Sequence, residues 1–320
     1  MRLTIAVFLA SIFAIAAQAQ TVPTLKVLPW DNHTAAVSLT FDDARPCQLD
    51  IAVPELEKRG MHGTFYLLIS KLSRFKDWEK AAENGEEIGS HTMTHQHPTL
   101  LDAENAEEQI EDSVHFLSDN LGLRPFTFAY PYGETTPGLD GWVKSFHFAA
   151  RAGWSDNFYV VPADNTDFYS IPSQVTMTAT TLDTYKSWVD TDLTKSAWTV
   201  FQIHGIGDEK SGWEPIPVET FTGMLDYMKA QEDKGLWVAP FGTVASYLKA
   251  QEEFEHARQG TDTHGVTYSW EVPPAFPDGV TLRITALEGV NLFQQGVKLE
   301  AEDGVYNVAF DARALTVVPR

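Results

Sequence analysis

The sequence predicts an α/β fold, built on a parallel sheet or barrel and followed by a small C-terminal all-β domain. Between residues 35 and 255, short apolar runs alternate with amphipathic stretches, which is typical of repeated βα units. After Gln259 the pattern changes to short β-prone runs separated by turn sequences. A chain of 320 residues accommodates one large domain with a small companion, and its single cysteine leaves stability to a buried core.

The N-terminal residues have the pattern of an export signal. Arg2 is followed by an apolar run from Leu3 to Ala17, and Ala17-Gln18-Ala19 is a small-x-small cleavage sequence. The run is short for a membrane span, and no cluster of charges that would stop transfer follows it. We therefore expect residues 1–19 to be a signal peptide, the mature chain to lack a transmembrane anchor, and the protein to be periplasmic or secreted.

The charge balance limits the class of partner. The chain carries 44 acidic and 23 basic side chains, for a formal net charge of −21 at pH 7. A surface that neutralises phosphates is not expected from this balance, so nucleic acid is excluded as a partner. An exported protein instead meets polymers that are too large to be imported. The sequence leaves the oligomeric state open.

Within the main domain the individual elements follow from periodicity and from end signals. The best helix is expected over residues 102–121, where Ile110, Val114, Leu117 and Leu121 form one apolar stripe. Asp102 can cap its start and Gly122 its end. Strands are expected at 36–41, 64–69, 127–130 and 198–203, and further helices at 50–59, 75–84 and around Phe221, Met224, Leu225 and Met228.

The C-terminal segment is expected to form its own small unit. Residues 260–265 resemble a linker, and residues 261–320 are expected to form a β-sandwich-like domain after a main domain over 20–258. This domain either binds glycan or braces the main domain. We favour bracing, because the sequence shows no cluster of exposed aromatic residues there.

Candidate metal ligands lie at two strand ends, where βα folds keep their functional loops. His91, His95 and His97 lie within seven residues, and the spacing of four places the first two on one face if the segment is helical. Alone, the pair is weak evidence for a metal. Asp42 and Asp43 end an apolar strand, where neighbouring side chains point to opposite sides and can divide two roles. One aspartate with two histidines gives three ligands and an open position, as in catalytic metal sites.

Two further strand ends carry polar chemistry. The turn at 128–133 can present backbone N–H groups to an oxyanion, or it can serve packing only. His204 follows an apolar strand, and it is either a packed residue or a catalyst. Four such strand ends in one chain favour a catalytic site.

Four motifs carry a resemblance to a known family: TFDD at 40–43, HTMTH at 91–95, FAYPYG at 128–133 and QIH at 202–204. In order and spacing they resemble the NodB-homology polysaccharide deacetylases of carbohydrate esterase family 4, over roughly residues 35–250. The resemblance implies a distorted (β/α) barrel of seven or eight strands and metal-dependent removal of acetyl groups from a glycan. A polymer or oligomer containing N-acetylglucosamine is favoured. The alternatives are an acetylxylan-type O-deacetylase, a non-catalytic glycan-binding relative and, less expected, a hydrolase of small amides.

The resemblance also implies roles for individual residues. Asp42 would be the general base and His204 the general acid, which predicts a bell-shaped dependence of rate on pH. The metal ligands would be Asp43, His91 and His95. Zinc is expected for this donor set, with cobalt, manganese or nickel as alternatives.

The resemblance also implies that the backbone N–H of Tyr132 stabilises the oxyanion.

Two departures from the family pattern concern the residues around Asp42 and His204. The family often has an arginine in the third motif where this chain has Ala129, and we expect Arg151 to supply that charge to Asp42. The family's Asp-x-x-Asp-Trp motif has no clear match here, so the sequence leaves open how His204 is tuned.

Overall fold

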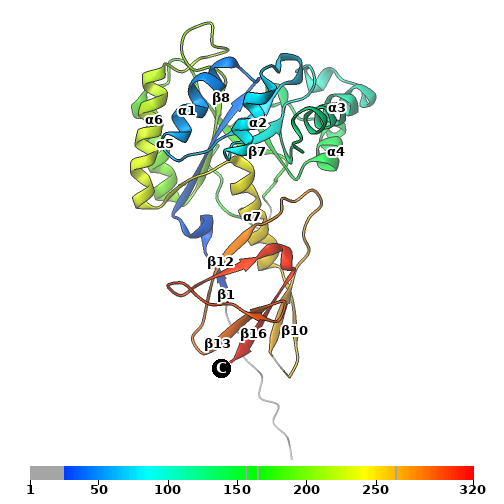
Figure 1. The fold of residues 1–320 in the computed structure, drawn as a ribbon, viewed down its shortest axis with the longest axis vertical. Coiled ribbons are helices and arrows are strands. Elements are labelled where there is room, and N and C mark those ends of the chain that lie inside the picture. The colour runs from blue at the N-terminus through cyan, green and yellow to red at the C-terminus, as the bar shows by residue number, and fades with distance from the viewer. Residues whose placement is uncertain (1–24, 156, 164–165, 264) are drawn as a thin grey trace, which may run out of the picture.

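The computed structural model describes residues 25–155, 157–163, 166–263 and 265–320 (Figure 1). The expected signal peptide at residues 1–19, with its cleavage after Ala19, lies outside these ranges. Within them, no helix is both long and apolar enough to cross a membrane.

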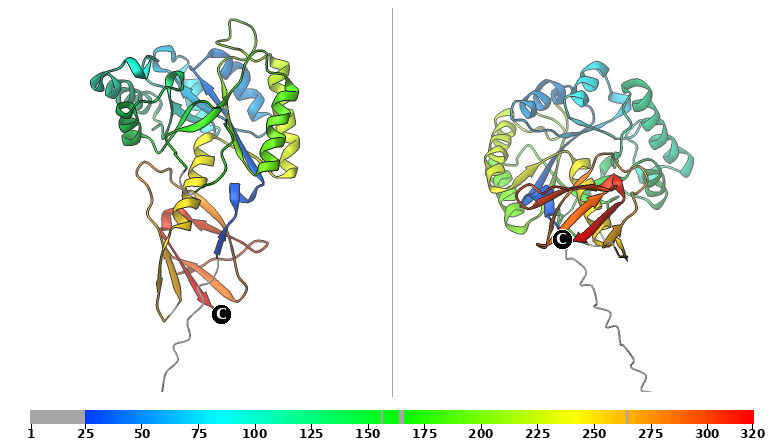
Figure 2. Two further views of the ribbon diagram at one scale, coloured as in Figure 1. Left: turned by 180° about the vertical axis from the view of Figure 1, so that it is seen from behind. Right: turned by 60° about the horizontal axis from the view of Figure 1, so that its bottom comes forward.

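In the described part of the chain, parallel strands close into a barrel with helices on its outside (Figure 2). The ring runs through seven strands in the order β2-β3-β4-β5-β6-β7-β8 and returns to β2, which confirms the predicted distorted (β/α) barrel. An eighth strand, β9, pairs with the first residues of β2. The bounds are β2 (Ala35–Asp42), β3 (Thr64–Leu67), β4 (Glu87–Ser90), β5 (Thr127–Ala129), β6 (Ala149–Trp154), β7 (Ile171–Val175), β8 (Trp198–Ile203) and β9 (Leu236–Val238).

The helices bury one apolar face each against this barrel. In α3 the predicted stripe of Ile110, Val114, Leu117 and Leu121 is buried. The expected caps are also present, because the Asp102 side chain accepts from the N–H of Asn105 and Gly122 has a φ of 65°. The helices are α1 (Val53–Glu57), α2 (Phe75–Glu83), α3 (Ala103–Leu121), α4 (Pro137–Phe146), α5 (Leu182–Lys195), α6 (Val218–Gln231) and α7 (Phe241–Glu255).

Strand β2 decides where the site lies, since all of its residues are buried. Val37, Leu39 and Phe41 pack in the cluster that includes residues of α6. The alternate side chains point the other way, as the twofold repeat of a strand requires. Thr40 donates to the Phe201 carbonyl of the neighbouring strand at 2.7 Å. Asp42 lies on the same side as Thr40, at the carboxyl end of the strand.

Helix α7 begins at the opposite end of the barrel. The Glu87 carboxylate, at the start of β4, accepts from the Gly242 N–H at 2.7 Å and from Thr64 Oγ1 at 3.1 Å. A Cβ at Gly242 would lie 2.4 Å from Phe126 Cε2, so only glycine fits there. From this point α7 runs into the C-terminal sheets (Figure 1).

Two antiparallel sheets form the C-terminal part. Residues Leu25–Val27 (β1) pair with β12, although they precede the barrel in sequence. The sheets are β10-β11-β16-β13-β14 and β1-β12-β15. The bounds are β10 (Arg258–Thr261), β11 (Val266–Ser269), β12 (Thr281–Ala286), β13 (Val290–Gln294), β14 (Val297–Lys298), β15 (Val305–Ala309) and β16 (Ala314–Pro319). The division into domains over 20–258 and 261–320 stays a prediction.

A buried carboxyl in α5 predicts a pH dependence of stability. Asp192 is fully buried; its Oδ1 accepts from Thr199 Oγ1 at 2.8 Å, and its Oδ2 has no hydrogen-bond partner among the described residues. Burial raises the pKa of Asp192 from 3.8 to about 8. Because the folded-state pKa lies above the unfolded one, the stabilisation is complete below about pH 4 and is lost as the pH rises to about 8.

Asp192→Asn is therefore expected to flatten the loss of stability between pH 5 and pH 8. The wild-type free energy of unfolding should fall by about 4 kcal/mol more than that of the variant over this interval. Urea unfolding at both pH values measures the difference. Asp183→Asn, which changes an exposed carboxylate of the same helix, is the control and should keep the wild-type slope. If the free energy of unfolding depended equally on pH in Asp192→Asn and in the wild type, the prediction would be contradicted.

Candidate active site

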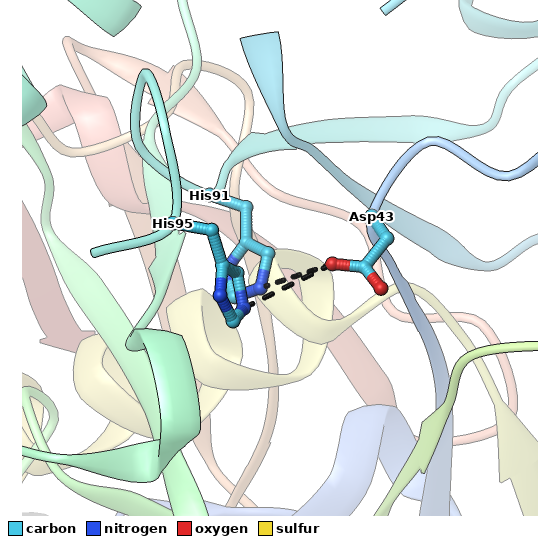
Figure 3. Close-up of side chains that lie close together, drawn as sticks. All are labelled: Asp43, His91 and His95. Atoms are coloured by element: carbon cyan, nitrogen blue, oxygen red, sulfur yellow. Dashed lines mark ion pairs between the residues drawn. The ribbon is translucent and has the colours of Figure 1, made fainter. Parts of the chain in front are cut away.

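Three side chains from two strand ends converge at the mouth of the barrel (Figure 3). Asp43 Oδ1 lies 3.9 Å from His91 Nε2 and 3.9 Å from His95 Nε2. One ligand atom from each of the three residues lies within 4.8 Å of the others. Two donors that each lie about 2 Å from one zinc ion are at most about 4 Å apart, and the 3.9 Å separations between Asp43 Oδ1 and the two imidazole nitrogens are within that limit. The donor set therefore fits a divalent cation.

The orientation of His91 also fits a metal ligand. Its Nδ1 hydrogen bonds to the Ala129 carbonyl at 2.8 Å. A proton on Nδ1 leaves a lone pair on Nε2, which is buried and has no hydrogen-bond partner among the described residues. Ligating histidines are commonly held in this way by a second hydrogen bond.

The histidines meet through a loop, not a helix. The helical arrangement considered for 91–95 is wrong, because this segment has no helical turn and Thr92 and His95 have φ values of 69° and 57°. Thr92 Oγ1 accepts from the His95 N–H at 3.1 Å and closes the loop. The two rings then meet edge to face with centroids 4.8 Å apart.

Arg45 orients the Asp43 carboxylate. Its Nη2 and Nε donate to Asp43 Oδ2 at 2.8 and 3.2 Å. Since Oδ2 is occupied by the guanidinium, Oδ1 is the atom that faces the histidines. Sequence reasoning missed Arg45; its position two residues after the carboxylate was the available signal.

Asp42 lies beside this group and is completely buried. Its Oδ2 accepts from Arg151 Nη2 at 2.7 Å and from Gln202 Nε2 at 3.1 Å. Burial opposes ionisation, but the positive charge of Arg151, together with His91 and His204, outweighs it and lowers the pKa of Asp42 to about 2. Asp42 is thus a carboxylate at neutral pH.

Arg151 reaches Asp42 from β6. It is the register partner of Ala129 on β5, and the small side chain at 129 leaves room beside it. The guanidinium carbon also lies 5.3 Å from the centroid of the Tyr66 ring, which supports it from one side.

His204 follows β8 and approaches Asp42 from the other side. Its Nε2 lies 3.7 Å from Asp42 Oδ2, and its ring meets Trp213 edge to face at 4.9 Å. Burial lowers the pKa of His204, and its Nδ1 has no hydrogen-bond partner among the described residues. Gln202, which sequence reasoning missed, lies two residues earlier, so strand alternation already placed it on the same side.

Tyr132 lies in the turn that follows β5. Its backbone has a φ of 57°, and its side chain is 56% exposed. The ring stacks on His97 at 3.7 Å and meets His95 edge to face at 4.6 Å. His97 Nδ1 in turn lies 3.0 Å from Glu134 Oε1. His97 therefore supports the Tyr132 ring and stands outside the three-donor group.

One open cavity of about 720 Å³ is lined by Asp42, Asp43, His91, His95, Tyr132 and His204, among others. It is larger than a second cavity, of about 590 Å³, between the base of the barrel and the C-terminal sheets. Three exposed aromatic side chains stand on its wall: Tyr132, Trp154 and Trp213. An open cavity with flat aromatic walls suits the faces of sugar rings.

Comparison with known proteins agrees with this arrangement. Residues 31–148 match the sequence model for polysaccharide deacetylases. They belong to that family. The matched residues contain three of the four motifs quoted above and all three candidate metal ligands.

Two curated relatives extend the match. The chain is 30% identical to the peptidoglycan-N-acetylmuramic acid deacetylase PdaC of Bacillus subtilis over 116 residues, which is 36% of this chain and 25% of that protein. It is 24% identical to a gellan lyase of a Bacillus species over 264 residues, 75% of this chain and 10% of that protein. The chain thus spans a quarter or less of these two curated relatives.

A solved structure shares the fold. It is that of a Mycobacterium smegmatis protein assigned as a polysaccharide deacetylase, with 17% identity and a TM-score of 0.55. The superposition covers 71% of this chain and 96% of that one. At this identity the likeness concerns the fold, and it supports the barrel described above.

Proposed function

We propose that this chain is an exported, metal-dependent polysaccharide deacetylase that acts on a polymer or oligomer containing N-acetylglucosamine. One observation carries the proposal: a three-donor metal group, an ionised buried Asp42 and His204 share one cavity. The family of residues 31–148 supports the reaction class. The expected signal peptide supports export, and packing of α7 and β1 against the C-terminal sheets supports a bracing role for residues 261–320.

Asp43, His91 and His95 would hold the metal through Oδ1, Nε2 and Nε2. We propose zinc, which suits imidazole and carboxylate donors, with cobalt, manganese and nickel as alternatives. When bound, such an ion polarises a carbonyl oxygen and lowers the pKa of water. Arg45 keeps Asp43 Oδ1 directed at the two imidazoles.

Asp42 and His204 would move the protons. Asp42, kept ionised by Arg151, takes a proton from the water that attacks the acetyl carbon. His204 gives a proton to the leaving amine, or to the alkoxide of an ester, as acetate departs. The backbone N–H of Tyr132 donates to the oxyanion while the carbon is tetrahedral.

Arg151→Met is expected to destabilise the protein because it leaves a buried charge without its partner. Both side chains of the Arg151–Asp42 pair are 1% exposed. The free energy of unfolding should fall by about 3–5 kcal/mol. Urea unfolding measures it, and the double variant Arg151→Met/Asp42→Asn should regain much of the loss. A stable single variant would show that the pair contributes nothing to folding.

Acetate release tests the function. The metal-loaded protein is offered chitohexaose and acetylated xylan side by side. Faster release from chitohexaose supports the proposed amide substrate, whereas release from xylan alone supports the O-deacetylase alternative. A metal-loaded, folded protein that binds these glycans and releases no acetate would be a non-catalytic relative.

A further inference from the structure

We propose that the cavity selects acetylated glycans that also carry carboxylate groups, such as uronate residues, and that Lys71 recognises the carboxylate. The inference rests on the proposed deacetylase function and specifies the substrate class of the same site. It follows from the charges on the cavity wall.

Apart from the histidines, the charged side chains that line the cavity are two acids, Asp42 and Asp43, and two bases, Arg45 and Lys71. Asp42 is paired with Arg151 at 2.7 Å, and Asp43 with Arg45 at 2.8 Å. The Lys71 ammonium has no ion pair or hydrogen bond to any described residue, and the side chain is exposed. The wall therefore offers one unpaired ammonium and no unpaired carboxylate.

The backbone at Lys71 is held beside the three candidate metal ligands, Asp43, His91 and His95. It ends a short 3-10 helix (Ile69–Lys71) that follows β3, between the strands that carry Asp43 and His91. The backbone of this turn is tied to the histidine loop, because the N–H groups of Ile69 and Ser70 donate to the carbonyls of Thr92 and Met93 at 3.2 and 2.8 Å. The ammonium can thus meet a neighbouring sugar while the acetyl group lies at the metal.

The local charge opposes that of the whole molecule. The chain has a net charge of −21, which disfavours an anionic polymer at long range. At an ionic strength of about 0.15 M, repulsion between exposed charges is screened beyond about 8 Å. Among the described side chains that line the cavity, the Lys71 ammonium is then the charge without an opposite partner. The aromatic walls hold sugar rings regardless of charge, so Lys71 supplies the discrimination.

Two matched substrate pairs test this. One is a hyaluronan hexasaccharide against chitohexaose; the other is acetylated polygalacturonate against acetylated xylan of equal acetyl content. We compare kcat/KM for acetate release at 0.15 M salt for the wild type, Lys71→Gln and Lys71→Arg. The matched control is Lys76→Gln, which makes the same charge change at an exposed lysine of α2 outside the cavity.

In whichever substrate pair the enzyme deacetylates, we expect kcat/KM for acetate release to be higher for the anionic member than for the neutral one. Lys71→Gln should lower that preference by about fivefold, mainly through KM, and Lys71→Arg should restore it. Lys76→Gln should leave the preference unchanged. Equal use of both members by the wild type, or equal effects of Lys71→Gln and Lys76→Gln, would overturn the inference. Acetate release from chitohexaose without release from hyaluronan overturns it but leaves the proposed function standing, whereas no release from any of the four overturns both.

Discussion

Replacing Asp42 with asparagine is expected to lower kcat/KM for acetate release by about 10²–10⁴-fold, the usual contribution of a positioned proton acceptor. Asparagine keeps the size of the side chain and can still accept from Arg151. It cannot take a proton from water at neutral pH. The loss should appear in kcat and in kcat/KM alike, because the interaction belongs to the transition state.

The controls for Asp42→Asn separate chemistry from folding. Asp50→Asn makes the same exchange at an exposed carboxylate that pairs with Arg74, and it should keep wild-type rates. Metal content and near-ultraviolet circular dichroism should match between Asp42→Asn and the wild type. If the folded, metal-loaded variant retained activity within about threefold, Asp42 would not be the general base.

Removal of the metal should lower the rate of acetate release at least as much as Asp42→Asn does. Chelation is expected to reduce acetate release to background and zinc to restore it, because Asp43, His91 and His95 are the donors that converge. His95→Ala should weaken zinc binding by more than about a hundredfold, since even residues that only support ligands are worth 10- to 100-fold. Metal titration by calorimetry measures this independently of turnover.

His97 supplies the matched control for the metal site. It lies two residues from His95, but its Nδ1 faces Glu134 and its ring supports Tyr132. His97→Ala should keep one zinc per chain, and added zinc should still raise its melting temperature. His95→Ala should show neither effect at the same zinc concentration. Equal zinc affinity in both variants would contradict the assignment of His95 as a ligand.

Sequence periodicity predicted the elements whose signals are local. The α3 stripe, its caps at Asp102 and Gly122, and the β8 run at Trp198–Ile203 all follow from short-range rules. The four strand-end motifs likewise meet in one cavity, because parallel strands in a barrel end at the same rim.

The parts that sequence reasoning missed depend on contacts across the fold. The loop that joins His91 to His95 adopts left-handed backbone at non-glycine residues, which no periodicity reveals. The hydrogen bond from Arg45 to Asp43 is a side-chain contact within a loop, where no regular pattern predicts it. The pairing of β1 with β12 joins segments that no local pattern connects.

That last pairing has a consequence for the order of folding. In β1, Leu25 lies opposite Ala286, so the contact closes a loop through the whole barrel. The entropy of closure grows only slowly with length, but a ribosome delivers the chain from its N-terminus and β12 emerges late. The barrel can assemble first, and the smaller unit forms only after β12 has followed the barrel strands.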